Sequence, residues 1–243
     1  MGDKCSVVAK ARASSVRSSS KPRPASKAAG GAPSRGDSTK ARLFTAAVQL
    51  FAQHGYADTT VDRIVRAAGV AKGTFFIHFA TKDAVVTELV RNQVRFARRA
   101  RDRVLATGGS PVDALRASIL TLGQQAAANR EITRVVISAN ILNPSLGGFA
   151  ESVFGGIIAE MMDDVRAAQR ASLLDAKASA ENVAGTLITS YFGAALYFAT
   201  APRTPPLMRL LEPVVEANLA GFGVAPRAPS KRRAAVRSPR AHA

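Results

Sequence analysis

The stretch TTVDRIVRAAGVAKGTFFIHF, residues 59–79, contains two short runs of apolar residues separated by a glycine. The apolar positions of the first run recur at the three- and four-residue spacing of one helix face, at Val61, Ile64, Val65 and Ala68. Gly69 can adopt a left-handed conformation without a Cβ penalty, so it can end this helix and reverse the chain. Because a second short helix can begin near Ala71, the stretch predicts a helix–turn–helix.

The ends and faces of this hairpin can also be predicted. Thr59 and Thr60 precede the first helix, and Thr59 and Asp62 have the spacing of a capping box with Asp in place of Glu. In the second helix Phe75 and Phe79, four residues apart, are expected to face inward against the first helix. The side chains left outward or at the rim are those of Lys72, Thr74, Ile77 and His78.

These outward residues suit a DNA-reading helix, since an α-helix fits the width of the major groove. Lys72 can reach a phosphate or a guanine edge, and His78 can donate to a phosphate oxygen. The Thr74 hydroxyl can donate or accept a hydrogen bond and its methyl can meet a thymine methyl, whereas Ile77 offers apolar contact alone. A hairpin that only packs inside a bundle would show the same glycine and apolar stripe, so the pattern leaves both interpretations open.

Charge is unevenly distributed along the 243 residues, whose formal net charge is +17. Counting Lys and Arg against Asp and Glu gives +7 for residues 1–36, +6 for 37–103, −2 for 104–224 and +6 for 225–243. The hairpin therefore lies in a basic third of the chain. This favours a polyanionic partner at that end and a different role for the slightly acidic part.

The terminal segments 1–36 and 225–243 are rich in Ala, Ser, Pro, Arg and Lys and are predicted to be disordered basic arms. The first has no continuous apolar stretch, which argues against a secretory signal; an organelle transit peptide remains the alternative. The single cysteine, Cys5, leaves no partner for an intrachain disulfide or a cysteine metal site, which fits a reducing compartment. We therefore expect a cytoplasmic protein.

Between the arms the apolar spacing is helical throughout and strand signals are weak. A first helix is expected to be capped by Asp37 or Ser38 and to end at Gly55, with its apolar face formed by Leu43, Ala46, Ala47, Leu50 and Phe51. Further helices are expected over residues 81–105, 112–128, about 131–141, 149–170, 178–199 and 206–221. The predicted fold class is all-α.

Residues 182–202 carry no charge and are long enough to span a bilayer. They also include Thr, Ser, Asn, Gly and Tyr, and their flanks show no marked positive-inside bias, so a helix of a soluble bundle or of a core shared by two subunits is the other interpretation. The final helix favours this second interpretation and no membrane contact, because it has a strong apolar stripe at Leu207, Leu210, Leu211, Val214, Val215 and Phe222.

Residues 37–97 resemble the N-terminal domain of the tetracycline-repressor (TetR) family, on the residues AAVQLFAQHGYADTTVDRIVRAAGVAKGTFFIHFATKDAVVTELV. The resemblance implies a dimeric one-component regulator, usually a repressor. Its three N-terminal helices would form a DNA-binding domain that binds a palindromic operator. A larger helical domain would bind a small ligand and dimerise, with the ligand changing the spacing of the two reading helices. Whether the ligand releases or promotes DNA binding is left open.

Carried over position by position, the resemblance gives a helix–turn–helix from Thr60 to Phe79. It implies that Thr60, at the cap, and Lys82, at the start of the fourth helix, contact phosphates. The predicted DNA-binding residues are Thr60, Lys72, Gly73, Thr74, Phe76, Ile77, His78 and Lys82. The family often has Tyr where this chain has Phe76, and that hydroxyl commonly contacts the DNA backbone. Phe76 cannot make this hydrogen bond, and the basic arms could supply salt-dependent attraction in its place.

The predicted organisation is a basic arm (1–36), a DNA-binding domain (37–97), a ligand-binding and dimerisation domain (98–224) and a basic tail (225–243). The predicted ligand-lining residues combine adaptable Met with the apolar body and polar end of Tyr: Val136, Asn140, Phe154, Met161, Met162, Tyr191, Phe192 and Tyr197. For any single one of them, an ordinary role in the core or the interface is the more common interpretation. The helices over 178–199 and 206–221 are expected to pair with their two-fold mates in a homodimer.

Catalysis is not predicted, because the histidines His54, His78 and His242 belong to no catalytic or metal-binding set and no phosphate-binding glycine loop is present. We predict no cofactor and no metal, and a largely apolar effector. The adjacent Asp163 and Asp164 point to different sides of a helix and are interpreted as a solvated face. An architectural protein that coats DNA with its arms, and a helical interaction protein, remain the alternatives.

Overall fold

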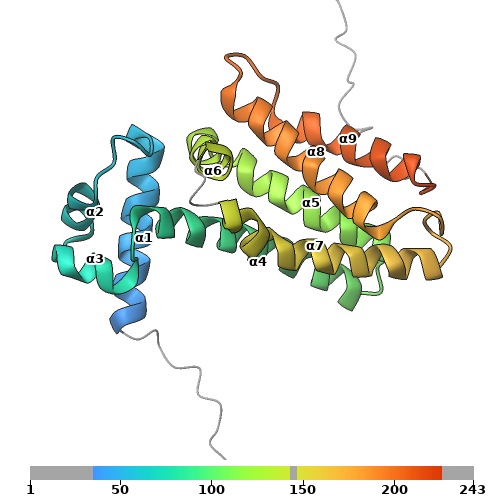
Figure 1. Ribbon diagram of the computed structural model, residues 1–243, viewed down its shortest axis with the longest axis horizontal. Helices are drawn as coiled ribbons and strands as arrows, with labels where there is room; N and C mark the ends of the chain where they lie inside the picture. Colours follow the sequence, from blue (N-terminus) through green and yellow to red (C-terminus); the bar gives the residue numbers. More distant parts are fainter. Residues whose placement is uncertain (1–34, 143–146, 226–243) are drawn as a thin grey trace, which may run out of the picture.

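The computed structural model describes residues 35–142 and 147–225, which form an all-helical structure (Figure 1). In chain order the helices are α1 (Arg35–His54), α2 (Val61–Ala68), α3 (Lys72–His78), α4 (Lys82–Ala106), α5 (Pro111–Ala127), α6 (Arg130–Leu142), α7 (Gly147–Arg170), α8 (Ala180–Thr200) and α9 (Leu207–Gly221). The predicted all-α class is confirmed. The two predicted basic arms lie almost wholly outside the described residues.

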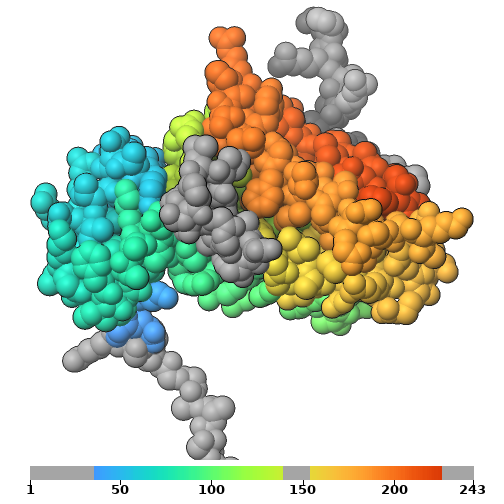
Figure 2. Space-filling model, in the orientation of Figure 1, coloured from blue at the N-terminus to red at the C-terminus, as the bar shows by residue number. Residues whose placement is uncertain are grey.

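The helices fall into two groups joined by α4. Figure 1 shows α1, α2 and α3 together at one end, with α4 running from them into a larger bundle that contains α5 to α9. Figure 2 shows the same division as a lobe of N-terminal residues beside a larger body. The predicted boundary between residues 37–97 and 98–224 falls inside α4, so this helix belongs to both groups; the boundary itself stays a prediction.

The first group is built around a small apolar core drawn from three helices, with the fully buried Leu43, Ala47, Phe51, Ile64 and Phe75. α1 begins at Arg35, so the prediction that Asp37 or Ser38 caps it is wrong. The helix includes Asp37 in its first turn, where a carboxylate interacts favourably with the helix dipole. Gly55 follows the last residue of α1 with φ +78°, as predicted.

The corner between α2 and α3 has the predicted glycine geometry. Gly69 is left-handed, with φ +63°, and its N–H donates to the Arg66 carbonyl. The next N–H, that of Val70, donates to the Val65 carbonyl at 3.0 Å, so the last carbonyls of α2 are satisfied within the turn. The chain therefore reverses over three residues and begins α3 at Lys72.

The cap of α2 differs from the capping box expected from the sequence. Thr60, not Thr59, is the N-cap, and its side chain accepts from the Arg63 N–H at 3.3 Å. Thr59 is fully buried and its hydroxyl donates to the Gly55 carbonyl at 2.7 Å. The burial of Thr59 moves the start of the helix by one residue and fixes the turn that follows α1.

In the larger bundle α5 is the central helix, in contact with α4, α6, α7, α8 and α9. α8 is long and apolar enough to span a membrane by composition, but it packs against α5, α6, α7 and α9. One side of α8 is buried along its whole length, at Val183, Leu187, Tyr191, Ala195 and Ala199. The uncharged segment is therefore a helix of the bundle core.

Candidate nucleic-acid interface

α3 has one buried side and one open side. Phe75 and Phe79 are buried against α1 and α2, whereas Ile77 is 79% exposed and Phe76 is 51% exposed. At 3.6 residues per turn, Ile77 lies opposite the two buried rings. Gly73 and Thr74 lie on either side of Ile77. We call this side of α3, formed by Gly73, Thr74, Phe76 and Ile77, the open face.

Lys72 and His78 lie at the edges of the open face. Lys72 is exposed and forms an ion pair with Asp62 of α2, with 2.9 Å between the ammonium and the carboxylate. Such an exposed pair contributes little to folding, so Lys72 can exchange it for a phosphate at low cost. His78 is half-buried at the last position of α3. The four outward residues predicted from the sequence are thus outward or at the rim.

Gly73 has open space where a side chain would lie. A Cβ built at this position would have no heavy atom within 4 Å. Nothing inside the described part of the chain therefore requires a glycine here, and Ala would be the better helix former. Glycine does allow a partner to approach the backbone closely.

Lys82, predicted to contact a phosphate, has internal partners. Its ammonium donates to the carbonyls of Tyr56 at 2.7 Å and Thr59 at 2.9 Å, and lies 4.0 Å from the centre of the Tyr56 ring. The Tyr56 hydroxyl donates to the Asp83 carboxylate. These contacts tie the turn after α1 to the start of α4, and we call the set Lys82, Tyr56, Thr59 and Asp83 the turn clamp.

The turn clamp is partly withdrawn from water. Burial lowers the pKa of Lys82, and the charges of Asp83 and Asp58 only partly oppose this. Burial and the hydrogen bond to Asp83 raise the pKa of Tyr56. The position of Lys82 in the clamp does not test its predicted phosphate contact, but it gives the residue a structural role that the sequence did not indicate.

A second cation missed in the sequence holds the end of α2. The Arg42 guanidinium of α1 donates to the carbonyl of Ala68 and, at 3.4 Å, to that of Gly69. These are the last carbonyls of α2, where a positive charge is favourable. α1 therefore supports the corner from which α3 departs.

The predicted ligand-lining residues lie mostly inside the bundle. Val136, Phe154, Met161 and Tyr191 are buried, Met162 and Phe192 are half-buried, and Tyr197 is half-exposed; the side chain of Asn140 lies outside the described residues. The Phe192 ring lies 5.1 Å from that of Phe154 and 5.3 Å from that of Tyr191, centroid to centroid. Three of the predicted residues thus form one aromatic cluster between α7 and α8.

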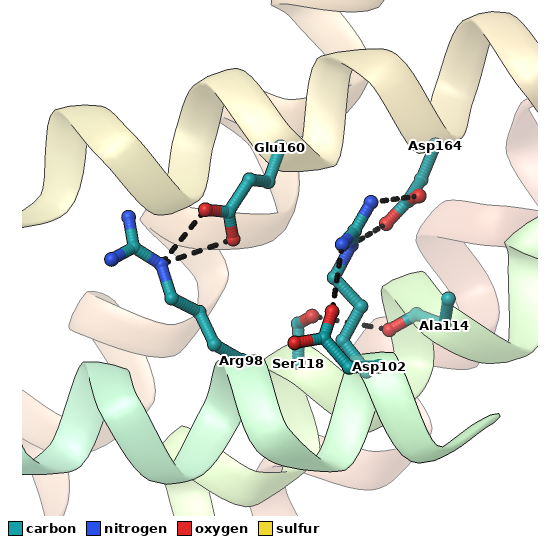
Figure 3. Close-up of polar contacts among 7 residues, drawn as sticks. Arg98, Asp102, Ala114, Ser118, Glu160 and Asp164 are labelled. Atoms are coloured by element: carbon teal, nitrogen blue, oxygen red, sulfur yellow. Dashed lines mark hydrogen bonds and ion pairs between the residues drawn. The ribbon is translucent and has the colours of Figure 1, made fainter. Parts of the chain in front are cut away.

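α4 is joined to α7 by two ion pairs (Figure 3). Arg98 contacts Glu160 at 2.9 Å, and Arg101 makes two hydrogen bonds to Asp164, at 2.6 and 2.7 Å. The interpretation of Asp164 as solvated is therefore wrong: its side chain is 4% exposed, although its neighbour Asp163 faces solvent. The hydrogen bonds to Asp164 raise the pKa of Arg101.

Two arginines of α6 hold the end of α8. Arg130 donates to the Ala201 carbonyl, and Arg134 donates to the Ala199 carbonyl at 3.1 Å. Arg134 also borders a cleft of about 460 Å³, between the turn after α1 and α6. α6 thus lies between the N-terminal group of helices and the end of α8.

Comparison with known proteins gives consistent matches. A family model described as bacterial regulatory proteins, tetR family, matches residues 43–89. The HTH-type transcriptional regulator UidR of Escherichia coli is 24% identical over 115 residues, which are 47% of this chain and 58% of UidR. The chain thus matches little more than half the length of this curated relative.

Solved structures match over more of the chain. FadR of Thermus thermophilus, a TetR family repressor in complex with lauroyl-CoA, has a TM-score of 0.61 and 27% identity, covering 79% of this chain and 98% of FadR. FadR of Bacillus subtilis, in complex with stearoyl-CoA, has a TM-score of 0.65 and 17% identity, covering 74% and 98%. The second match shows a shared fold alone.

Proposed function

The chain belongs to the tetR family of bacterial regulatory proteins, and from this premise we propose that it is a one-component regulator that binds a palindromic operator as a homodimer. The observation that carries the proposal is the open face of α3, which lies opposite Phe75 and Phe79. The corner at Gly69 and the Arg42 contacts fix the start of this helix, and the turn clamp fixes the start of α4 that follows it. A helix placed in this way with an open face can enter a major groove.

The outer side of α8 and α9 supports the proposed homodimer. Gly185 and Gly193 of α8 and Gly221 of α9 would each place a Cβ in open space. Glycine inside a helix costs up to about 1 kcal/mol relative to alanine, so Gly185 and Gly193 call for a reason outside this fold, whereas Gly221 is the last residue of α9. Together with the exposed Leu196 and Val214, they allow the close approach of two-fold related helices in a four-helix interface.

We propose a small, largely apolar effector that binds among α6, α7 and α8. The aromatic cluster of Phe154, Tyr191 and Phe192 provides apolar surface with one hydroxyl. Two proteins of this fold have been solved with lauroyl-CoA and stearoyl-CoA, so acyl thioesters are the first compounds to test. The result expected is a change of operator affinity with acyl-CoA and none with CoA alone.

Effector binding would change DNA affinity by shifting the population of molecules between two positions of α4. The turn clamp fixes the first residues of α4 to the DNA-reading helices, and the two ion pairs fix its later part to α7. A movement of α7 on ligand binding would thus be passed to α3 and change the distance between the two copies of α3.

Selection from random duplex DNA, followed by footprinting with the full-length chain, tests the proposed function. The expected result is a symmetric site whose half-sites lie one helical turn apart, or a multiple of it. Removing residues 1–36 and 225–243 should lower affinity and its salt dependence while keeping the preferred sequence. Equal binding to site and random competitor at every salt concentration would instead support the architectural alternative.

A further inference from the structure

The centre of the open face is apolar and uncharged. Ile77 is the most exposed large apolar side chain among the described residues, and the half-exposed Phe76 is next to it. The polar or charged groups of α3, those of Lys72, Thr74 and His78, lie at its flanks and edges. An apolar surface therefore occupies the position that would project furthest into a groove.

Folding within this chain does not explain these two side chains. The core contacts of α3 are already made by Phe75 and Phe79. A β-branched residue is a weak helix former, so Ile77 adds nothing to a seven-residue helix that exposes it. Phe76 does have a local contact: its ring meets the edge of the Phe75 ring, 5.4 Å away at 85°, which holds its orientation.

The composition of α3 restricts how it could read bases. The helix contains no Arg, Asn, Gln, Asp or Glu, the residues that make two-pronged or acidic contacts to base edges. Its one cation, Lys72, already faces Asp62. The C5 methyl of thymine is the apolar group that the major groove displays. An apolar side chain at this position can contact the thymine methyl but cannot hydrogen-bond to a base edge.

We infer that Ile77, with Phe76 beside it, reads the C5 methyl of a thymine in each operator half-site. The inference rests on the proposed function and specifies the base feature recognised by that site. Gly73, without a side chain, lets the helix come close enough for Ile77 to touch the methyl. The basic rim provides the charge complementarity for the flanking phosphates, and the γ-methyl of Thr74 extends the apolar surface.

Replacing single thymines of the selected operator with deoxyuridine tests this, because deoxyuridine keeps every hydrogen-bonding group and loses only the methyl. We expect one position in each half-site at which the change weakens binding about three- to fivefold, the value of one buried carbon group. Changing both half-sites should multiply the two losses. At the same position 5-methylcytosine should bind more tightly than cytosine by a similar factor.

The Ile77→Ala variant connects the effect to the residue. It should bind the thymine and deoxyuridine operators equally, whereas Leu173→Ala, which shortens an exposed apolar side chain far from α3, should keep the difference. Circular dichroism would check that both variants are folded. Ile77→Val, which retains part of the apolar surface, should retain part of the discrimination.

The outcomes separate the inference from the proposed function. A symmetric operator that binds equally well with deoxyuridine at every position would overturn the inference and leave the regulator intact. Discrimination that persists in Ile77→Ala would also overturn it. Failure to select any operator would reject the proposed function and, with it, the thymine reading.

Discussion

Apart from the ion pair between Lys40 and Glu88 at its first end, the two ends of α4 are held by different chemistry. At the first end Lys82 donates to two neutral backbone carbonyls of the turn after α1. Further along, Arg101 meets the buried carboxylate of Asp164, and Arg98 meets the half-exposed Glu160. In the first link the cation donates to neutral carbonyls and the Asp83 carboxylate accepts from Tyr56, whereas in the second link the cations contact carboxylates directly.

This difference indicates how the two links respond to change. The hydrogen bonds from Lys82 depend on the backbone conformation of the turn after α1, and this turn can adjust when they are lost. A buried ion pair depends on both partners, since either one alone is left as an uncompensated charge. Substitutions at the junction with α7 should therefore cost more stability than substitutions in the turn clamp. Of the two ion pairs at this junction, the more buried one should contribute more.

The largest effect is expected from Asp164→Ala. The substitution leaves the mostly buried Arg101 with the exposed Asp102 as its remaining carboxylate partner, and should reduce the free energy of unfolding by about 3 kcal/mol in urea denaturation. Asp163→Ala, one residue away and exposed, is the matched control and should cost well under 1 kcal/mol. Equal losses in the two variants would contradict the difference between the links.

A double substitution separates charge from packing at the same place. Combining Arg101→Met with Asp164→Leu removes both charges and should recover most of the stability lost in Asp164→Ala. If the double variant were less stable than Asp164→Ala, the pair would be held by packing of the arginine stem and not by charge.

Lys82→Met should have the next largest effect. It removes two charge-assisted hydrogen bonds to the carbonyls of Tyr56 and Thr59, and should lower stability by about 1.5–2 kcal/mol in the absence of DNA. The control is Lys40→Met, which removes the same kind of cation from a more exposed ion pair, that of Lys40 with Glu88. Reduced operator affinity with unchanged stability would show that Lys82 acts through a phosphate alone.

Gly73→Ala should act with opposite signs on stability and binding. Alanine is the better helix former by up to about 1 kcal/mol and meets no neighbouring atom, so thermal stability should rise slightly. Operator affinity should fall, because the added methyl faces the duplex. An increase in both would indicate that DNA does not approach α3 at this residue.

The smallest effect is expected from Arg98→Met. Arg98 and Glu160 are each about one-third exposed, so their pair should contribute no more than about 1 kcal/mol. This loss should shrink further at high salt, whereas the loss in Asp164→Ala should change little. A loss that does not depend on salt would mean that the two pairs on α4 are equivalent.

The features predicted correctly from the sequence are those decided by local chemistry. The corner at Gly69, the inward Phe75 and Phe79 and the exposed Ile77 follow from spacing alone. The capping-box spacing points to Thr59, whereas the resemblance places Thr60 at the cap, and the burial of Thr59 in a tertiary contact decides for Thr60.

The long-range contacts could not be predicted in the same way. Two adjacent acidic residues on a helix are expected to point to different sides. Their sequence does not indicate that Asp164 contacts Arg101, which lies 63 positions earlier in the chain. The acceptors of Lys82 are backbone carbonyls, which no residue type reveals. The proposed effector site is the least predictable part, because aromatic and Met residues form ordinary cores as readily as pockets.

The length of α4 has a consequence for the size of movement that the proposed regulation would require. Its 25 residues span about 37 Å, so a tilt of about 5° at the α7 end displaces the far end by about 3 Å. That is close to the 3.4 Å rise between neighbouring base pairs along one strand. A rotation of only a few degrees could thus move each copy of α3 out of register with its proposed half-site.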